Sequence, residues 1–317
     1  MSEKHFIIFP SVQIPLVICD TISRINEQKS VDAAYYPNVV CRVYFNFSSE
    51  DDYKGIICIF KFFNVDKKIS AGCGGGIMAL EGKAGSILWI RYMKHELFAV
   101  NCNQDLTEDT IADCVVGGRM ASLFAINGAN GDIIWDIQPT MGDPIYETSN
   151  FYTPLYISKD IDSDNINDLL VMHGGDPLRV PSAKVRIPAR LIFISSKTGI
   201  ILSWSVVPDG AESYYSPQEL VDSKGNNKIL FGTGGETHRG SLFLISLDDL
   251  FSGKISKAKM LHSDCCKGVM VPPVLIDLNN DTVLDIIMAL FNSTVIAIDG
   301  DSHQILWKSH FAGSETY

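Results

Sequence analysis

The chain has 317 residues, 46% of them hydrophobic and 20% charged, which excludes a disordered protein and leaves enough chain for a substantial core. The formal net charge of −11 disfavours a nucleic-acid partner, because phosphate-binding surfaces need clustered Lys and Arg and the sequence has no such stripe. Cation binding suits this charge better.

The first region, residues 1–71, matches the rest of the chain poorly. Its apolar segment at residues 6–19 contains two prolines and is too short to cross a bilayer as a helix. The small residues of a signal-peptide cleavage site do not follow it. We therefore expect no membrane anchor within this chain. Strand-like runs at residues 39–47 and 56–63 indicate that part of this region contributes strands to the first structural repeat.

Residues 72–317 form the second region, in which one order of elements recurs. The clearest copy, Asp277 to Trp307, has carboxylates and amides at alternate positions, then an apolar strand, a second strand, and a third strand that ends in tryptophan. The same order runs from Asp105 to Trp135 and from Asp160 to Trp204, the last copy with an insertion at residues 176–189. The repeats can be drafted at residues 72–92, 93–138, 150–207, 210–262 and 268–310.

A unit of three or four short strands cannot bury both faces of its sheet alone, so successive units must stack. This pattern predicts an all-β protein, a β-propeller of four-stranded blades. We expect the closing tryptophans, Trp89, Trp135, Trp204 and Trp307, to wedge against the adjacent blade. The final residues resemble the opening of one more blade, so we expect an incomplete propeller with about five to six blades present.

The acidic loops have the spacing of calcium-binding loops. A calcium ion takes six to eight oxygens, which side chains at positions 1, 3, 5 and 9 and a carbonyl at position 7 can supply. The strongest candidate has four carboxylates. Its residues are Asp160, Asp162, Asp164, Ile166 and Asp168. The weaker candidates are Asp105, Thr107, Asp109, Ile111 and Asp113, and Asp277, Asn279, Asp281, Val283 and Asp285.

Position 6 of such a loop needs a left-handed backbone. Asn165 tolerates it, whereas Thr110 and Thr282 are β-branched and strained there. The alternative for each loop is a metal-free aspartate turn held by side-chain to backbone hydrogen bonds.

The chain has eight cysteines, many for a cytosolic protein. Cys102 and Cys114 flank one acidic loop, which permits a disulfide across the hairpin, and two buried free thiols are the alternative. Cys58 and Cys73 are a second candidate disulfide pair. Asn46 and Asn292 are glycosylation acceptors if the chain enters the secretory pathway.

Several motifs resemble parts of enzyme active sites, but none forms a complete one. The glycine-rich residues 72–76 and 232–236 lack the lysine and helix of a phosphate-binding loop. His173-Gly174 is not accompanied by a nucleophile elbow. The adjacent pair Cys265 and Cys266, with A-x-[DN]-G-x6-W runs at Ala125 and Ala297, resembles features of quinoprotein alcohol dehydrogenases. No catalytic residue follows from these motifs, and we expect a protein that is not an enzyme.

Eight short segments of unusual sequence resemble segments of one known family. They lie at residues 72–75, 98–105, 113–119, 173–177, 208–217, 231–238, 267–273 and 289–294. With them, residues 72–317 resemble the ectodomain of the animal family with sequence similarity 234. The resemblance implies a single-pass membrane protein with an extracellular or lumenal propeller of FG-GAP and quinoprotein-type repeats and no known catalytic activity. The sequence departs from the family pattern in four features. These are the absent membrane span, the poorly matching first seventy residues, the Thr, Asn and Thr at position 6 of the acidic loops, and the Cys265-Cys266 pair.

Together these features predict a non-catalytic, calcium-stabilised propeller that serves as the extracytoplasmic interaction domain of a membrane glycoprotein. Its partner is an unknown protein, and its membrane attachment is through an anchor outside this chain. The alternative is a quinoprotein-like dehydrogenase or a polysaccharide-acting enzyme on the same fold.

Overall fold

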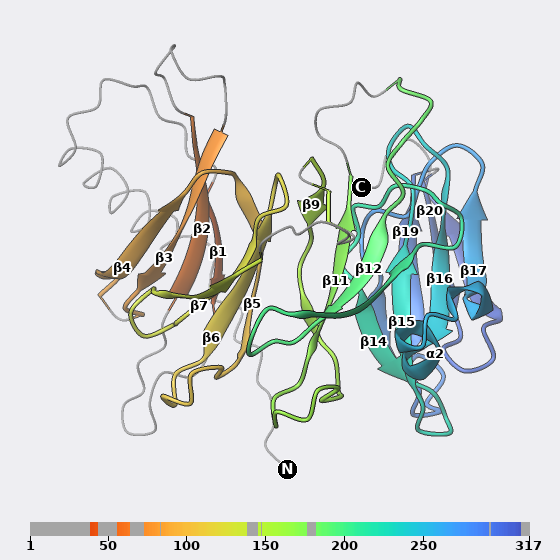
Figure 1. Ribbon diagram of the computed structural model, residues 1–317. Coiled ribbons are helices and arrows are strands. Elements are labelled where there is room, and N and C mark those ends of the chain that lie inside the picture. The colour runs from red at the N-terminus through yellow and green to blue at the C-terminus, as the bar shows by residue number, and fades with distance from the viewer. Residues whose placement is uncertain are drawn as a thin grey trace.

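A computed structural model describes residues 39–43, 56–63, 73–82, 84–137, 145–146, 148–175, 182–291 and 293–311. In the first three strands only the side chains of Ile57, Ile59 and residues 74–80 are described. These residues form five antiparallel sheets, each built from strands consecutive in the chain. The first four sheets follow one another in chain order across the view, from orange to blue, and the fifth sheet overlaps the fourth in this view (Figure 1). We call them blades 1 to 5.

Every blade is an up-and-down meander in which each strand pairs with the next. Blade 1 contains β1 (Val39–Val43), β2 (Ile56–Phe63), β3 (Cys73–Leu80) and β4 (Ile87–Met93). Blade 2 contains β5 (Leu97–Gln104), β6 (Asp113–Gly118), β7 (Leu123–Ile126) and β8 (Ile133–Asp136). The first blade thus takes two of its strands from before Gly72, where the drafted repeat began.

Blade 3 has a divided first strand. It contains β9 (Asn150–Phe151) and β10 (Leu155–Tyr156), which both pair with β11 (Leu169–Gly174), followed by β12 (Arg190–Ile194) and β13 (Ile201–Val206). Thr153 and Pro154 lie between the two short pieces, where proline cannot donate a ladder hydrogen bond. Part of the predicted insertion, residues 176–181, lies outside the described residues.

Blade 4 differs from the others in its last connection. It contains β14 (Gln218–Val221), β15 (Asn227–Gly232), β16 (Gly240–Ser246) and β17 (Lys259–Asp264). Between β16 and β17 lie helix α2 (Leu247–Phe251) and the 3₁₀ turn η1 (Ile255–Lys257). Leu247 and Leu250 on α2 are buried, so the helix packs onto the core rather than projecting from it. Nothing in the repeat pattern predicted this helix.

Blade 5 closes the described chain. It contains β18 (Val274–Ile276), β19 (Asp285–Leu290), β20 (Thr294–Ile298) and β21 (Ile305–His310). Four of the five antiparallel sheets have four strands and the blade 3 sheet has five because its first strand is divided, so the predicted fold class is confirmed. Across the described residues, no helix has both the length and the apolar character that crossing a bilayer requires.

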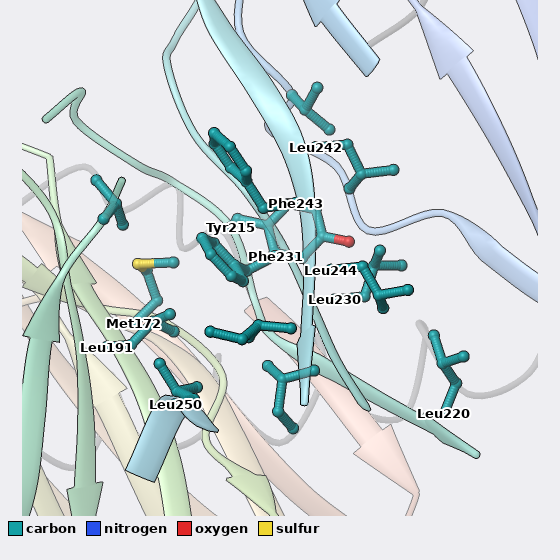
Figure 2. Close-up of a cluster of buried hydrophobic side chains, with 14 of the residues drawn as sticks. Met172, Leu191, Tyr215, Leu220, Leu230, Phe231, Leu242, Phe243, Leu244 and Leu250 are labelled. Atoms are coloured by element: carbon teal, nitrogen blue, oxygen red, sulfur yellow. The ribbon is translucent and has the colours of Figure 1, made fainter. Parts of the chain in front are cut away.

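The core lies between neighbouring blades rather than inside one sheet. Alternate side chains of a strand point to opposite faces, and a central strand between two neighbours buries both. β6, β11 and β12 are accordingly buried at every residue. The largest cluster joins blades 3, 4 and 5 around Tyr215, Phe231 and Phe243 (Figure 2). Two further clusters join blade 1 to blade 2 and blade 2 to blade 3.

Candidate metal loops and blade contacts

In three blades a predicted acidic loop connects the outer strand to the next one, from β5 to β6, from β10 to β11 and from β18 to β19. Loop 1 is residues 105–113 in blade 2, loop 2 is residues 160–168 in blade 3, and loop 3 is residues 277–285 in blade 5. Each loop begins and ends with aspartate. Position numbers below count from the first aspartate.

The first and fifth positions of each loop cap the backbone of the turn. In loop 2, Asp160 accepts hydrogen bonds from the N–H groups of Ser163 and Asn165 at 2.6 and 2.8 Å, and Asp164 accepts from Ile166 at 2.9 Å. Loop 3 repeats these contacts with Asp277 and Asp281 as the acceptors, and in loop 1 Asp105 accepts from Asp109 and Thr110 while Asp109 accepts from Ile111. These hydrogen bonds stabilise the turn in the absence of an ion, as in other aspartate turns.

The backbone at position 6 is left-handed in all three loops. The φ angle is 71° at Thr110, 69° at Asn165 and 72° at Thr282. Asparagine adopts this conformation at little cost, whereas a β-branched threonine is strained there. Loops 1 and 3 therefore store strain that loop 2 avoids.

The last aspartate of each loop is buried and ties the loop to the outer part of its blade. Asp113, Asp168 and Asp285 are all 0% exposed. One carboxylate oxygen accepts from the N–H at position 2, at 2.7 Å from Leu106, 2.7 Å from Ile161 and 2.8 Å from Leu278. The other oxygen accepts from the turn between the last two strands, at 2.9 Å from Gly128, 3.3 Å from Ser196 and 2.9 Å from Gly300.

The longer bond in blade 3 has a steric cause. A Cβ added at Gly128 would lie 2.1 Å from the carbonyl oxygen of Ala112, and one at Gly300 would lie 2.0 Å from that of Leu284. Ser196 does carry a Cβ, and its hydroxyl donates to the corresponding carbonyl of Asn167 at 2.9 Å. Sequence reasoning did not single out these turn residues, although the A-x-[DN]-G run contains two of them.

Loop 2 has a carboxylate at each of positions 1, 3, 5 and 9, whereas loops 1 and 3 have three each. Carboxylate oxygens of Asp160, Asp162 and Asp168 lie within 4.8 Å of one another. Asp164 Oδ2 is shielded from solvent and has no hydrogen-bond partner among the described residues. Burial raises the pKa of Asp168 above its ordinary value, and the neighbouring carboxylate of Asp162 raises it further. A bound cation would relieve this repulsion.

In loops 1 and 3 an asparagine amide lies among the carboxylates. Asn127 Nδ2 donates to Asp109 Oδ2 at 3.0 Å and to Thr107 Oγ1 at 3.2 Å. Asn279 Nδ2 donates to Asp281 Oδ2 at 2.9 Å and to Asp299 Oδ2 at 2.7 Å. The amide N–H groups donate to the carboxylates that would otherwise face a cation. Each amide group would have to rotate by half a turn to present its oxygen to an ion.

The carbonyl ligands predicted at position 7 belong to Ile111, Ile166 and Val283. The backbone N–H group of each of these residues donates to the aspartate at position 5 at 2.8 or 2.9 Å. Ile166 and Val283 are buried, with side chains that point away from water. Calcium ligation by these carbonyls stays a prediction.

Two of the predicted tryptophans dock on the next blade. Trp89 Nε1 in blade 1 donates to the carbonyl of Gly128 in blade 2 at 2.8 Å. Trp135 Nε1 in blade 2 donates to the carbonyl of Ser196 in blade 3 at 2.8 Å. A Cβ added at Gly131 or Gly199 would lie 2.6 or 2.7 Å from the indole ring, so only glycine leaves room for it. Both tryptophans are 8% exposed.

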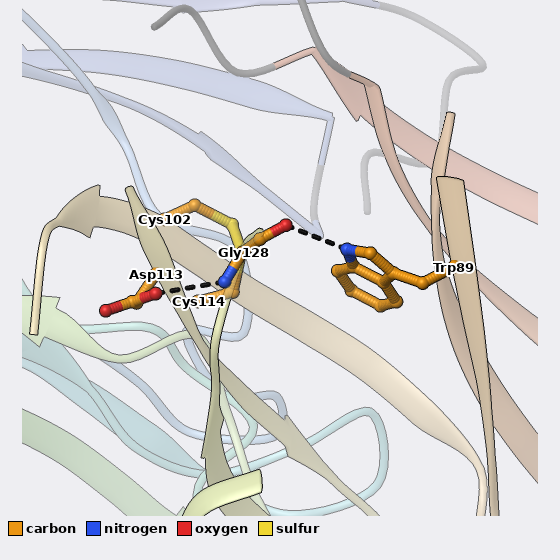
Figure 3. The surroundings of a disulfide bond; sticks show 5 residues. All are labelled: Trp89, Cys102, Asp113, Cys114 and Gly128. Atoms are coloured by element: carbon orange, nitrogen blue, oxygen red, sulfur yellow. Dashed lines mark hydrogen bonds between the residues drawn. A yellow bond between two sulfur atoms is a disulfide. The ribbon is translucent and has the colours of Figure 1, made fainter. Parts of the chain in front are cut away.

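The acidic loop and the docked tryptophan meet at one residue of the turn between the last two strands. Figure 3 shows Asp113 accepting from the N–H of Gly128, while the carbonyl of Gly128 accepts from Trp89. In blade 3, Asp168 and Trp135 contact the N–H and carbonyl of Ser196 in the same way. The loop aspartate therefore fixes the turn that receives the preceding blade, whether or not the loop holds an ion.

The sequence profile described as the FAM234A/B beta-propeller matches residues 61–265, well over half of the chain. The chain belongs to this family. It is 26% identical over 177 residues to Protein FAM234B of Mus musculus, covering 55% of this chain and 26% of the mouse protein. It is 26% identical over 146 residues to Protein FAM234A of Homo sapiens, covering 41% of this chain and 26% of the human protein. The chain thus spans about a quarter of these curated relatives, and neither name states an enzymatic activity.

Among solved structures, Sqt1 of Saccharomyces cerevisiae aligns with 80% of this chain and 58% of its own, at 15% identity and a TM-score of 0.48. BamB from Moraxella catarrhalis aligns with 80% of this chain and 61% of its own, at 11% identity and a TM-score of 0.41.

Trp204 of this FAM234-family propeller does not dock, contrary to the sequence-based expectation. Trp89 and Trp135 lie four residues after the left-handed Gly85 and Gly131, whereas Trp204 lies five residues after Gly199. One extra residue in a strand reverses the face to which a side chain points. Trp204 is therefore 44% exposed.

Ser203 takes the docking position in blade 3. It pairs with Phe193 just before the register shift, as Trp135 pairs with Ala125 in blade 2. Its Oγ donates to the carbonyl of Phe251 on α2 at 3.1 Å. In blade 5, Trp307 does follow the left-handed His303 by four residues, but the described residues contain no later blade, and its indole is 41% exposed.

The structure joins Cys102 and Cys114 in a buried disulfide between β5 and β6 of the propeller (Figure 3). The bond closes the ends of loop 1 covalently. The side chains of Cys58 and Cys73 lie outside the described residues, and the backbone register pairs Cys58 with Met78 and Cys73 with Phe63. The predicted glycosylation acceptors Asn46 and Asn292 also lie outside the described residues.

His173, which the sequence placed in a glycine-rich motif, is a core residue of β11. Its Nε2 accepts from the N–H of Tyr146 at 2.9 Å, and its Nδ1 lies 3.1 Å from the carbonyl oxygen of Asn150. Because a carbonyl only accepts, the proton is on Nδ1 and the ring is neutral. Burial lowers the pKa of His173 to about 3. The ring also stacks on Phe151.

Proposed function

We propose that this propeller is a non-catalytic, extracytoplasmic interaction module of a membrane glycoprotein, and that calcium bound at loop 2 stabilises it. Family membership supports the module, since the related proteins carry no enzymatic name. The membrane and extracytoplasmic parts of the proposal rest on the resemblance of the sequence phrases to the FAM234 ectodomain.

The observation that carries the interaction role is a set of exposed apolar residues in and beside blade 5. Ile305, Leu306 and Trp307 lie on its edge strand β21, Val274 and Ile276 lie on the opposite edge strand β18, and Val271 and Phe311 lie just outside the strands. Exposed apolar side chains on an edge strand are a candidate contact for a partner. The exposed indole of Trp307 adds a residue type enriched at binding hot spots.

A surface variant tests the interaction role. We would display the chain on cells, crosslink its neighbours and identify them by mass spectrometry, comparing wild type with Ile305→Ser/Trp307→Ser. The variant should lose specific neighbours while its melting temperature stays within a few degrees of wild type, because both side chains are exposed. An unchanged set of neighbours would remove blade 5 from the proposal.

Calcium at loop 2 is supported by the three converging carboxylates and by the raised pKa of Asp168. The test is the melting temperature in millimolar calcium and in chelator for wild type, Asp162→Asn and the loop 3 control Asp281→Asn. Ligand linkage predicts about 2.7 kcal/mol of stabilisation at a hundredfold excess over Kd. Wild type and the loop 3 variant should both respond, and Asp162→Asn should not. Equal melting temperatures of wild type in calcium and chelator would refute calcium binding.

Glycosylation tests the glycoprotein part of the proposal. With a cleavable leader added, the chain should gain carbohydrate at Asn46 or Asn292, seen as a mobility shift that endoglycosidase reverses and that Asn→Gln substitution removes. A secreted chain without carbohydrate at either acceptor would contradict the glycoprotein part of the proposal.

A further inference from the structure

Two adjacent cysteines follow the last strand of blade 4. Cys265 and Cys266 lie directly after β17, on the connection that leads to blade 5, and are joined to each other in a disulfide. Both are exposed. The disulfide between Cys102 and Cys114 is by contrast buried, with its cysteines 5% and 0% exposed. A reductant in solution can therefore reach the adjacent pair far more readily.

The turn that carries the pair is anchored on both sides. Asp264 Oδ1 accepts from the N–H of Cys266 at 2.8 Å and of Lys267 at 3.1 Å. The carbonyl of Lys267 accepts from Gly240, and the N–H of Gly268 donates to Gly235 at 2.8 Å. The sulfurs thus belong to a turn whose backbone is held by the neighbouring β15–β16 connection.

The backbone on the far side of the pair has no room to shift. A Cβ added at Gly268 would lie 2.2 Å from the carbonyl carbon of Gly234. The ammonium of Lys267 lies 4.9 Å from the centre of the Phe291 ring in blade 5, which directs that charge to the aromatic face. Reduction of the pair is therefore expected to leave the position of both cysteines largely unchanged.

The turn brings three metal-binding atoms together. A carboxylate oxygen of Asp264 and the sulfurs of Cys265 and Cys266 lie within 4.8 Å of one another. In the disulfide the sulfurs carry no thiolate charge, and thiolates are the form that binds metal. Two thiolates and a carboxylate, with water in a fourth position, match the ligand preference of zinc and of the softer cadmium ion.

We propose that the Asp264-Cys265-Cys266 turn is a redox-gated site for a thiophilic divalent cation, closed as the disulfide and open as the dithiol. Opening requires an external dithiol of the thioredoxin class. Its thiolate attacks one sulfur, the Cys265–Cys266 bond breaks, and a second thiol of the reductant resolves the mixed disulfide. Two electrons and two protons pass to the protein thiols, and the reductant leaves as its own disulfide. Metal binding then releases the thiol protons.

Cadmium is the probe for the test, because its bond to thiolate sulfur absorbs in the ultraviolet. The full chain would be titrated with Cd²⁺ before and after reduction with a phosphine, which is removed before the metal is added. The matched control is Cys265→Ser/Cys266→Ser, which keeps every other cysteine of the chain. Reduced wild type should bind one more cadmium ion per chain than the reduced control. Unreduced wild type should bind no more than the control.

Asp264→Asn separates ligation from support of the turn. Asparagine keeps an oxygen that can accept from Cys266 and Lys267 but lacks the negative charge. Its cadmium affinity should fall at least about tenfold, while its melting temperature stays close to wild type. Equal cadmium binding by reduced wild type and the double serine variant would overturn the proposal, and so would equal binding before and after reduction.

Discussion

Replacing Trp135 by alanine should destabilise the propeller far more than replacing Trp204. Trp135 is 8% exposed, its ring lies against Gly199, and its Nε1 donates to the carbonyl of Ser196 at 2.8 Å. Truncating a buried tryptophan costs roughly 3–5 kcal/mol. Trp204 is 44% exposed, and its truncation should cost less than about 1 kcal/mol.

The pair is a matched comparison, because both residues are tryptophans on the outermost strand of their blades. Urea unfolding followed by far-ultraviolet circular dichroism measures each free energy of unfolding without relying on the fluorophore that is removed. Trp135→Phe, which keeps a ring but not the N–H, should cost an intermediate amount, of which about 1 kcal/mol is the lost hydrogen bond. If Trp204→Ala were as destabilising as Trp135→Ala, the assignment of docked and exposed faces would be refuted.

Three further substitutions extend this reasoning. Asp285→Ala leaves the N–H groups of Leu278 and Gly300 without their acceptor and should lower the free energy of urea unfolding by about 2–4 kcal/mol. Asp281→Ala, at an exposed position of the same loop, should lower it by less than about 1 kcal/mol. Equal losses for the two variants would contradict the structural role of position 9. Thr282→Gly removes a β-branched residue from a φ of 72° and should raise the free energy of unfolding by about 1 kcal/mol, and a loss of stability would show that the threonine is unstrained. The pKa of His173 is about 3 in the folded chain, below the ordinary 6.5. As the pH falls, the imidazole therefore becomes protonated in the unfolded chain before it does in the folded one. The free energy of unfolding should fall by about 1.4 kcal/mol per pH unit from about pH 6 towards pH 3. The difference in unfolding free energy between wild type and His173→Gln should show this slope, and a difference independent of pH would exclude a neutral buried imidazole.

The repeat was visible in the sequence because its turn residues and strands recur in one order. The sites of the acidic loops and of Trp89 and Trp135 followed from that order. Trp204 was misplaced because a tryptophan near the end of a repeat was taken as equivalent to the others, although the distance from the left-handed glycine differs by one residue. Counting from Gly199 rather than from Asp160 would have placed Ser203 at the docking position.

Other features lay beyond the pattern for physical reasons. Helix α2 replaces a turn in blade 4, and its five residues are too few to show a helical period. The role of Gly128 depends on an approach between β6 and the β7–β8 turn, which are separated in sequence and meet only in the folded blade. The amide contacts of Asn127 and Asn279 with the loop carboxylates likewise arise from tertiary placement, and they distinguish loop 2 from loops 1 and 3.

The central claim is that the last aspartate of an acidic loop and the tryptophan of the preceding blade act through one shared turn. A double-mutant cycle of Trp89→Phe and Asp113→Ala measures this directly, since one side chain contacts the carbonyl and the other the N–H of the same residue, Gly128. We expect a coupling energy of about 0.5–3 kcal/mol in the free energy of unfolding. Losses that add within about 0.3 kcal/mol would show that loop and blade contact are independent, and would contradict the account.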